Sequence, residues 1–208
     1  MANISDEEGR FLVKKAREII EKFVKEGKRI GEVSGDYKIL DEMRGVFVTI
    51  NKIKNHEKEL RGCIGFPIAY YPLRKGLAEA AIASASEDPR FEKLNAKELP
   101  KIVVEVSILT EPKLIEVKSP KEYLSKIKIG VDGLIVKWAY GSGLLLPQVP
   151  VEYKWDVEEF LSHTCMKAGT SPDAWLMPET KVYSFQAEVF EELEPNGKVV
   201  RKELRAQP

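Results

Sequence analysis

One short stretch of this sequence combines a thiol, a guanidinium and two glycines. Arg61, Gly62, Cys63 and Gly65 fall within the six residues 60–65, and Cys63 is one of only two cysteines in the chain. If the stretch is a β-strand, Arg61 and Cys63 share one face, because side chains alternate along a strand. A guanidinium near a thiol favours the thiolate, which attacks electrophiles and binds metals. The stretch therefore predicts a reactive thiol with Arg61 as its electrostatic partner.

The same residues are compatible with a purely structural role. Gly62 and Gly65 carry no side chain, so either another backbone or a ligand could approach them closely. Free cysteine is among the most buried residue types, so Cys63 could also be a small packing residue. A nucleophile usually needs a base such as histidine, and His56 and His163 are both expected at the surface. From the residues alone, the reactive thiol and the packed thiol remain alternatives.

Other residues could complete a site around such a thiol. Arg90 follows Asp88 at the end of a predicted helix, where the two could orient a substrate or form an ion pair at the helix end. Glu152 and Trp155 belong to an irregular, semi-apolar segment of the kind that often builds pocket walls. Two cysteines and two histidines match no zinc spacing, and no Asp-rich loop is present. No metal site is predicted, and the cofactor is left open.

Composition favours a soluble cytoplasmic protein. The 208 residues, 43% of them hydrophobic, suffice for one large domain or two small ones. The stretch Met1–Arg10 is polar and acidic, unlike a signal peptide. No apolar run approaches the roughly 20 residues that a membrane-spanning helix needs. Two cysteines cannot form a disulfide framework, so reduced thiols and a cytoplasmic location are expected.

Charge excludes one class of partner and suggests a habitat. The chain has 33 basic and 33 acidic residues, a net charge of zero, and the charges are interspersed. Nonspecific nucleic-acid binding depends on phosphate neutralisation, so it is not expected, whereas specific contact with RNA stays open. A charged content of 32% with few amide side chains is typical of a thermophile's surface.

Periodicity predicts two similar sets of secondary-structure elements in an α+β fold. A capping box at Ser5 starts a helix that ends at Gly27, and Ser119 and Pro120 start a short helix or turn between the two sets. Each set has the order strand, strand, helix, strand, which suggests a duplicated β-β-α-β unit, with coincidence among common elements as the alternative. Sheets of mixed or antiparallel strands, flanked by helices, are expected. The first set is strand 45–50, polar loop 51–59, strand 60–66, a helix from Pro72 to the Asp88 region, and strand 102–109; the second is strands 133–136 and 143–146, a helix capped by Asp156, and strand 182–190, followed by a hairpin turn at Asn196 and Gly197.

Several blocks of sequence resemble the AMMECR-type domain family, and its archaeal members in particular. They are residues 60–65, 88–91, 132–134 and 144–149, the last followed by Glu152 and Trp155. The resemblance extends over roughly residues 9–192. It implies one domain, 1–208, of two subdomains with a cleft between them and the Cys63 stretch near their junction. The smaller subdomain is expected at about 36–118, and the larger at 1–35 plus 119–208.

The resemblance strengthens a functional role for Arg61, Gly62, Cys63 and Gly65, which match the family's own motif, but it brings no reaction with it. In some bacterial relatives the domain occurs with Memo-like and radical-SAM-like proteins, an association that hints at a shared metabolic or redox pathway. Gln148 stands where other members carry an acid, which weakens any role for that position as a general acid.

The leading functional hypothesis is an enzyme-like small-molecule site. Cys63 would be its nucleophile or redox thiol and Arg61 its electrostatic partner or anion clamp, with Arg90 and Glu152 as outlying contacts and Gly62, Gly65 and Trp155 shaping the site. The alternatives are a non-catalytic module that binds a protein or a specific RNA, and a structural subunit of a complex that uses the apolar segment 66–73 as an interface. The substrate, the partner and the oligomeric state remain open.

Overall fold

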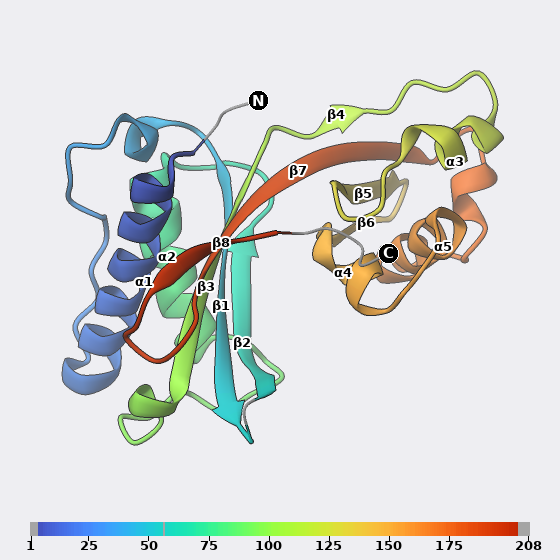
Figure 1. Ribbon diagram of the computed structural model, residues 1–208. Helices are drawn as coiled ribbons and strands as arrows, with labels where there is room; N and C mark the ends of the chain where they lie inside the picture. The colour runs from blue at the N-terminus through green and yellow to red at the C-terminus, as the bar shows by residue number, and fades with distance from the viewer. Residues whose placement is uncertain (1–3, 56, 204–208) are drawn as a thin grey trace. The chain divides into compact units, whose positions relative to one another are not determined.

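The computed structural model describes residues 4–55 and 57–203 and groups them into two compact units (Figure 1). The first unit contains residues 4–109 and 188–202, and the second contains 110–187 and residue 203. The fold class is α+β, as predicted, with antiparallel pairing of the strands within each unit. The grouping differs from the expected division at 35/36 and 118/119, because the first helix and the last strand both pack within the first unit.

The first unit is a sheet with two long helices on one of its faces (Figure 1). Its strands lie in the order β2-β1-β3-β7, and β8 pairs with the last residues of β7. The elements are α1 (Asp6–Glu26), β1 (Gly45–Lys54), β2 (Glu57–Phe66), α2 (Leu73–Ser86), β3 (Ile102–Leu109), the end of β7 (Lys181–Glu192) and β8 (Val199–Lys202), with 3-10 turns at Lys38–Asp41 and Leu99–Lys101.

Helix α1 begins and ends where its sequence predicts. Ser5 accepts a hydrogen bond from the backbone of Glu8, whose carboxylate accepts one from the backbone of Ser5, so the predicted capping box is confirmed. Gly27 ends the helix in the left-handed conformation, with φ of 66°.

The predicted loop at 51–59 is wrong, because β1 and β2 continue through it as a hairpin. β1 reaches Lys54 and β2 begins at Glu57. The charges there alternate in sign across the ladder, with Lys52 opposite Glu59 and Lys54 opposite Glu57. Opposite charges on facing strands stabilise a polar ribbon, so the charged residues do not interrupt the sheet.

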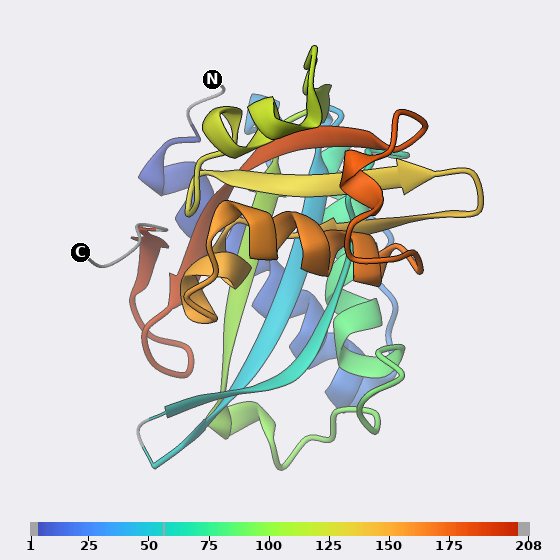
Figure 2. The same ribbon diagram turned by 90° about the vertical axis from the view of Figure 1, so that its right-hand side faces the viewer.

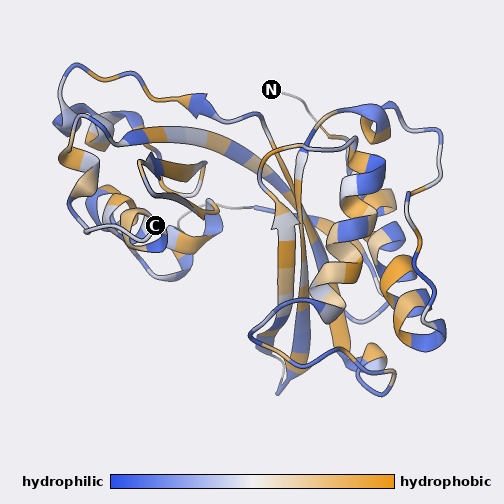
Figure 3. Cartoon of the chain, turned by 180° about the vertical axis from the view of Figure 1, so that it is seen from behind, coloured by the Kyte–Doolittle hydropathy of each residue, from blue (hydrophilic) through white to orange (hydrophobic). Residues whose placement is uncertain are grey.

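The core of the first unit lies between the sheet and the two helices. Figure 3 shows the apolar colouring of the strands and of the facing sides of the helices. The residues that pack against the helices come from alternate positions of β1 and β3, because successive side chains point to opposite faces of a sheet, although all eight residues of β3 are buried. They include Val46, Val48 and Ile50 of β1 and Val104, Val106 and Ile108 of β3, packed with Leu12, Ala16 and Ile20 of α1 and Leu77, Ala81 and Ile82 of α2.

The second unit contains a smaller sheet with a helix against it. β5 pairs with β6 on one side and with the first part of β7 on the other, and β4 pairs with the opposite edge of β7. Figure 2 shows β5 beside β7 and α5 next to them. Asp156 caps α5 through a capping box with Glu159, as predicted for this helix start. The elements are β4 (Lys113–Leu114), α3 (Tyr123–Lys126), β5 (Asp132–Trp138), β6 (Gly141–Leu145), α4 (Gln148–Glu152) and α5 (Val157–Lys167), with 3-10 turns at Pro120–Glu122 and Ala174–Leu176.

The expected β-β-α-β echo recurs in the strand pairing. In each unit the first strand of a hairpin pairs with the second strand and with the strand that follows the helix, giving β2-β1-β3 and β6-β5-β7. A glycine of the second strand, Gly62 or Gly143, pairs with a buried residue of the first strand, Ile50 or Val136. A methyl group on either glycine would collide with the backbone of the following helix or its cap. In both units, therefore, a glycine in the second strand of the hairpin lets the following helix pack closely against it.

Among the described residues, no helix is long and apolar enough to cross a membrane.

Candidate functional site

Cys63 lies on the sheet face of the first unit that is not packed against α1 and α2. Val48 and Ile50 of β1 are buried in the cluster that includes both helices. Thr49, between them, therefore points to the opposite face, because side chains alternate along a strand. Cys63 is the direct partner of Thr49 on β2, so its half-buried side chain shares that face.

Three polar side chains form a row across neighbouring strands on this face, and we call Cys63, Thr49 and Glu105 the polar row. Thr49 is the direct partner of Cys63 on one side and of Glu105, on β3, on the other. The Thr49 hydroxyl donates a hydrogen bond to the Cys63 sulfur at 3.3 Å. Glu105 is only 4% exposed, and its carboxylate accepts a hydrogen bond from Lys202 Nζ at 3.0 Å. A buried carboxylate therefore lies one residue away from the thiol across the sheet.

Electrostatics in the polar row raise the pKa of both of its acidic groups. Burial raises the pKa of the Cys63 thiol, the Glu105 charge adds to that rise, and the hydrogen bond from Thr49 opposes it. Burial also raises the pKa of the Glu105 carboxyl, against the lowering effect of Lys202. The resting thiol is therefore protonated at neutral pH, which differs from the thiolate expected from the neighbouring arginine.

Asp88 and Arg90 join the end of α2 to the open edge of β2. The Asp88 carboxylate accepts a hydrogen bond from the backbone N–H of Cys63 at 2.8 Å. It also accepts hydrogen bonds from Arg90 Nε at 3.0 Å and Nη2 at 2.7 Å. The bonds from Arg90, foremost, and from the backbone of Cys63 hold the pKa of Asp88 at about 2. Arg90 is thus brought beside the Cys63 backbone, and 55% of its side chain stays exposed.

Arg61 does not share the face of Cys63, so that expectation is wrong. The ladder between β1 and β2 shifts register between Ile50 and Asn51, which leaves Arg61 without a partner in a β-bulge. A bulge breaks the alternation of side chains. The Arg61 guanidinium instead contacts Glu98, with Nε 2.8 Å from Oε1 and Nη2 3.0 Å from Oε2, and Nη1 donates to the carbonyl of Glu92 at 2.8 Å.

The glycines of the motif accommodate the chain's own backbone. A Cβ on Gly62 would lie 2.1 Å from the carbonyl oxygen of Ser84 in α2, and one on Gly65 would lie 2.3 Å from the carbonyl oxygen of Val46 in β1. Of the two expected neighbours, a backbone or a ligand, the structure shows the backbone at both positions.

Glu152 and Trp155 belong to the second unit, so they form no part of the site built here within the first. Glu152 is the exposed last residue of α4. The Trp155 ring stacks on His163, with centroids 3.9 Å apart, and on Tyr153, with centroids 5.0 Å apart. Its aromatic surface is therefore used in internal stacking, which also half-buries the histidine that was expected to be solvated. His56 lies outside the described residues.

Sequence reasoning missed Thr49 and Glu105, although one of them left a signal. Glu105 is the single charged residue in the otherwise apolar strand Ile102–Leu109, and a lone charge in a buried strand indicates a partner or a role. Thr49 left no such signal, because its position beside Cys63 depends on the register of the hairpin. Across residues 4–55 and 57–203, no group of three acidic, histidine or cysteine side chains is arranged to hold a metal ion.

Comparisons with known proteins confirm the resemblance to the AMMECR-type family. The family model described as AMMECR1 matches residues 13–190. The chain is 53% identical over 198 residues to protein MJ0810 of Methanocaldococcus jannaschii, covering 95% of this chain and 96% of that protein. It is 54% identical over 205 residues to protein PYRAB00100 of Pyrococcus abyssi, covering 98% and 100%. The crystal structure of the uncharacterized protein PH0010 from Pyrococcus horikoshii is similar, with a TM-score of 0.90, 52% identity and coverage of 96% of this chain and 98% of that one.

Proposed function

Because the chain belongs to the AMMECR1 family, we propose that its family motif serves an enzyme-like small-molecule site in which the Cys63 thiol is the reactive group. The observation that carries the proposal is the polar row. Thr49 bonds to the sulfur, and Glu105 is a buried carboxylate on the adjacent strand. A carboxyl group whose pKa is raised by burial is better suited to exchanging a proton with a neighbouring thiol than an exposed one.

Within this site some motif residues take part in the chemistry and the others hold the strand in place. Cys63 supplies the thiol, and Arg90, half exposed beside it, is the cation available to an anionic group of a ligand. Arg61, Gly62 and Gly65 hold β2 against the rest of the unit, so their contribution is positional. A cytoplasmic location belongs to the proposal, since both cysteines are free thiols.

Alkylation of the folded protein with iodoacetamide tests the proposal, with Cys63 and Cys165 distinguished by peptide mass mapping. Cys63 is half-buried and Cys165 fully buried, so Cys63 is expected to react first, at a rate that rises with pH around a midpoint above the ordinary thiol value of about 8.5. Glu105→Gln removes a charge that raises the thiol pKa, so the midpoint falls. Thr49→Val removes a bond that lowers it, so the midpoint rises.

If Cys63 reacts only after the protein unfolds, the reactive-thiol proposal fails. Arg61→Lys serves as the control, because Arg61 contacts Glu98 and is absent from the groups that shift the thiol pKa. Its midpoint should match that of the parent protein. A midpoint shift in this control as large as that of Glu105→Gln would mean that the altered reactivity reports general loosening of β2 and not the polar row.

A non-catalytic binding module is the second candidate, and three observations favour it. The thiol is protonated at rest, and the motif glycines pack against the chain itself. The segment between β2 and α2 also exposes apolar side chains, with Ile68 at 40% and Tyr70 at 67%. On this proposal Cys63→Ala keeps the affinity for a partner protein or RNA, whereas Tyr70→Ser, at the exposed segment, loses it.

A further inference from the structure

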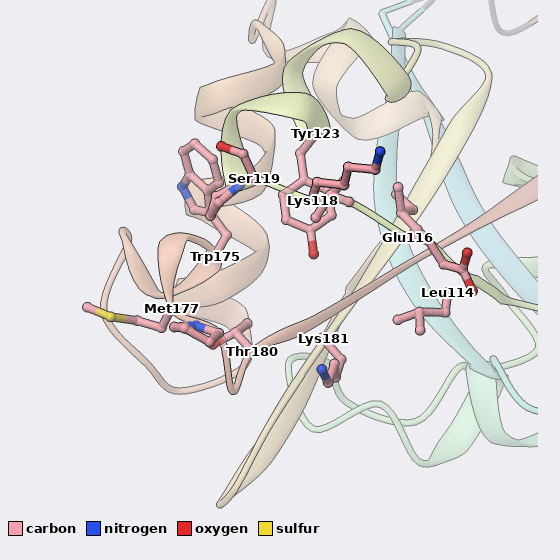
Figure 4. Close-up of a pocket in the computed structure, with 13 residues that line it drawn as sticks. Leu114, Glu116, Lys118, Ser119, Tyr123, Trp175, Met177, Thr180 and Lys181 are labelled. Atoms are coloured by element: carbon pink, nitrogen blue, oxygen red, sulfur yellow. The ribbon is translucent and has the colours of Figure 1, made fainter.

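The second unit contains a cavity that the polar row does not touch. It has a volume of about 380 Å³ (Figure 4). It is lined by residues 114–120, by Tyr123 of α3, and by Trp175, Met177, Pro178, Thr180 and Lys181. All of these residues belong to the second unit. A volume of this size is at the lower end of the range for small-molecule sites.

One wall of the cavity is aromatic. The rings of Tyr123 and Trp175 meet edge to face, with centroids 6.5 Å apart, and both residues are more than nine-tenths buried in the core of the unit. Ile115 and Val117, on the neighbouring segment, pack against the same core. Rigid aromatic and branched side chains of this kind form a preformed surface for a flat apolar body.

Two hydroxyl groups that line the cavity have no hydrogen-bond partner among the described residues, and their oxygen atoms are accessible from the cavity. Tyr123 and Thr180 are each 5% exposed, and neither side chain makes a hydrogen bond within residues 4–55 and 57–203, although both line the cavity. Figure 4 shows the Tyr123 hydroxyl directed towards the side on which Thr180 and Lys181 lie. Because no other group of the described residues occupies them, both hydroxyls are free to donate hydrogen bonds to a ligand in the cavity. Burial raises the pKa of Tyr123, which keeps its hydroxyl a neutral donor.

A cation with no counter-ion stands beside these hydroxyls. Lys181, the first residue of β7, lines the cavity and forms no ion pair with any residue in the described ranges. Its direct partner across the ladder is Lys137 of β5, whose ammonium lies over the ring of Tyr183, 5.0 Å from its centroid. Lys137 is thus engaged with an aromatic ring, and the exposed Lys181 is the cation that remains available to an anion in the cavity.

We propose that this cavity binds a small organic carboxylate with a flat apolar body. The carboxylate accepts hydrogen bonds from Tyr123 and Thr180 and pairs with Lys181, and the apolar body lies against the ring of Trp175. Hydrogen-bond donors and a cation at one end, and aromatic walls elsewhere, match the two ends of such a molecule. The site is separate from the polar row in residues and chemistry, so either proposal can fail without the other.

The probe is 2-naphthoate, and its uncharged counterpart is 2-naphthamide. Titration of the full chain, followed by ¹H–¹⁵N NMR, should shift the amides of residues 114–120 and 175–181. Lys181→Met is expected to raise the Kd for 2-naphthoate by about fivefold or more. Tyr123→Phe is expected to raise it by roughly three- to tenfold, because a charge-assisted hydrogen bond is lost. Lys121→Met is the matched control, because this exposed lysine is outside the lining, and its affinity should be unchanged.

Comparison of probes separates the two halves of the proposal. If the apolar body contributes to binding, inorganic phosphate should bind much more weakly than 2-naphthoate. If the carboxylate contributes, 2-naphthamide should also bind much more weakly than 2-naphthoate. The proposal is overturned if about 5 mM 2-naphthoate leaves these amides unshifted, since a ligand with a Kd near 1 mM would then occupy most sites. Equal affinity in Lys181→Met and Lys121→Met, or equal binding of 2-naphthamide, would also overturn it.

Discussion

Replacement of Gly62 by alanine should destabilise the first unit through a single backbone collision. The new Cβ would lie 2.1 Å from the carbonyl oxygen of Ser84 in α2. Real Cβ contacts are well over 3 Å, and a carbonyl in a packed helix cannot rotate away like a flexible side chain. The helix must therefore move relative to β2 by about 1 Å, and overpacking of this kind costs about 1–3 kcal/mol.

One effect works in the opposite direction and is smaller. Gly62 does not have a positive φ, so alanine fits its backbone and stabilises by about 0.4–1 kcal/mol through the unfolded chain. The net loss in the free energy of unfolding is then between about 0 and 2.6 kcal/mol relative to the parent protein. For a chain of this size, each kcal/mol lowers Tm by about 2–4 °C.

Thermal unfolding followed by circular dichroism measures this loss, and Gly31→Ala is the matched control. A Cβ on Gly31 would have no atom within 4 Å, so its Tm should stay the same or rise slightly. Hydrogen exchange should locate the loosening of Gly62→Ala in β2 and α2. If Gly62→Ala unfolds at the same temperature as Gly31→Ala, close packing against α2 does not explain the glycine at position 62. Contact with a ligand would then be the better explanation.

Two further substitutions probe charges buried in or beside the first sheet. Arg17→Met removes the partner of Glu192, whose side chain is 2% exposed. Denaturant titration should show a loss of about 3–5 kcal/mol in the free energy of unfolding, and a loss below about 1 kcal/mol would contradict this. Adding Glu192→Gln to Arg17→Met should recover part of the loss, because it removes the unpaired buried charge. Asp88→Asn should cost roughly 1–2 kcal/mol near pH 7, after allowance for the exposure of Arg90. Because the folded pKa of Asp88 is lowered from 3.8 to about 2, its contribution is complete above pH 4 and lost as the pH falls towards 2, so an unchanged difference between variant and parent across that window would refute the assignment.

Local signals in the sequence predicted most of the fold. The helix caps at Ser5 and Asp156 depend on residues three positions apart in the sequence. The strand Ile102–Leu109 is predicted from its mostly apolar residues. These features are decided within a few residues, so they can be recognised without knowing which strands pair. The hairpin end at 51–59 was missed because its charges are stabilised by partners on the facing strand, which composition alone does not identify.

The arrangement of the candidate site could not be predicted in the same way. Arg61 and Cys63 are two residues apart, and only the bulge opposite Ile50 and Asn51 places them on different faces. Thr49 and Glu105 reach the thiol through pairings over 14 residues and more. Register is set by the packing of whole strands, so the partners of a side chain in a sheet are a property of the folded unit and not of its neighbours in sequence.

The path of β7 has a consequence for the order of events during synthesis. Its first residues belong to the second unit, and its last residues return the chain to the first. There Glu192 accepts hydrogen bonds from Arg17 and from the backbone of Val104. A ribosome that has made the first 109 residues has therefore produced a sheet whose buried Arg17 lacks Glu192 and has only Glu21, at 3.6 Å, as a counter-ion. This unit stays incomplete until residues 188–202 emerge. No single cut in the gene isolates the first unit, since its two pieces flank the second.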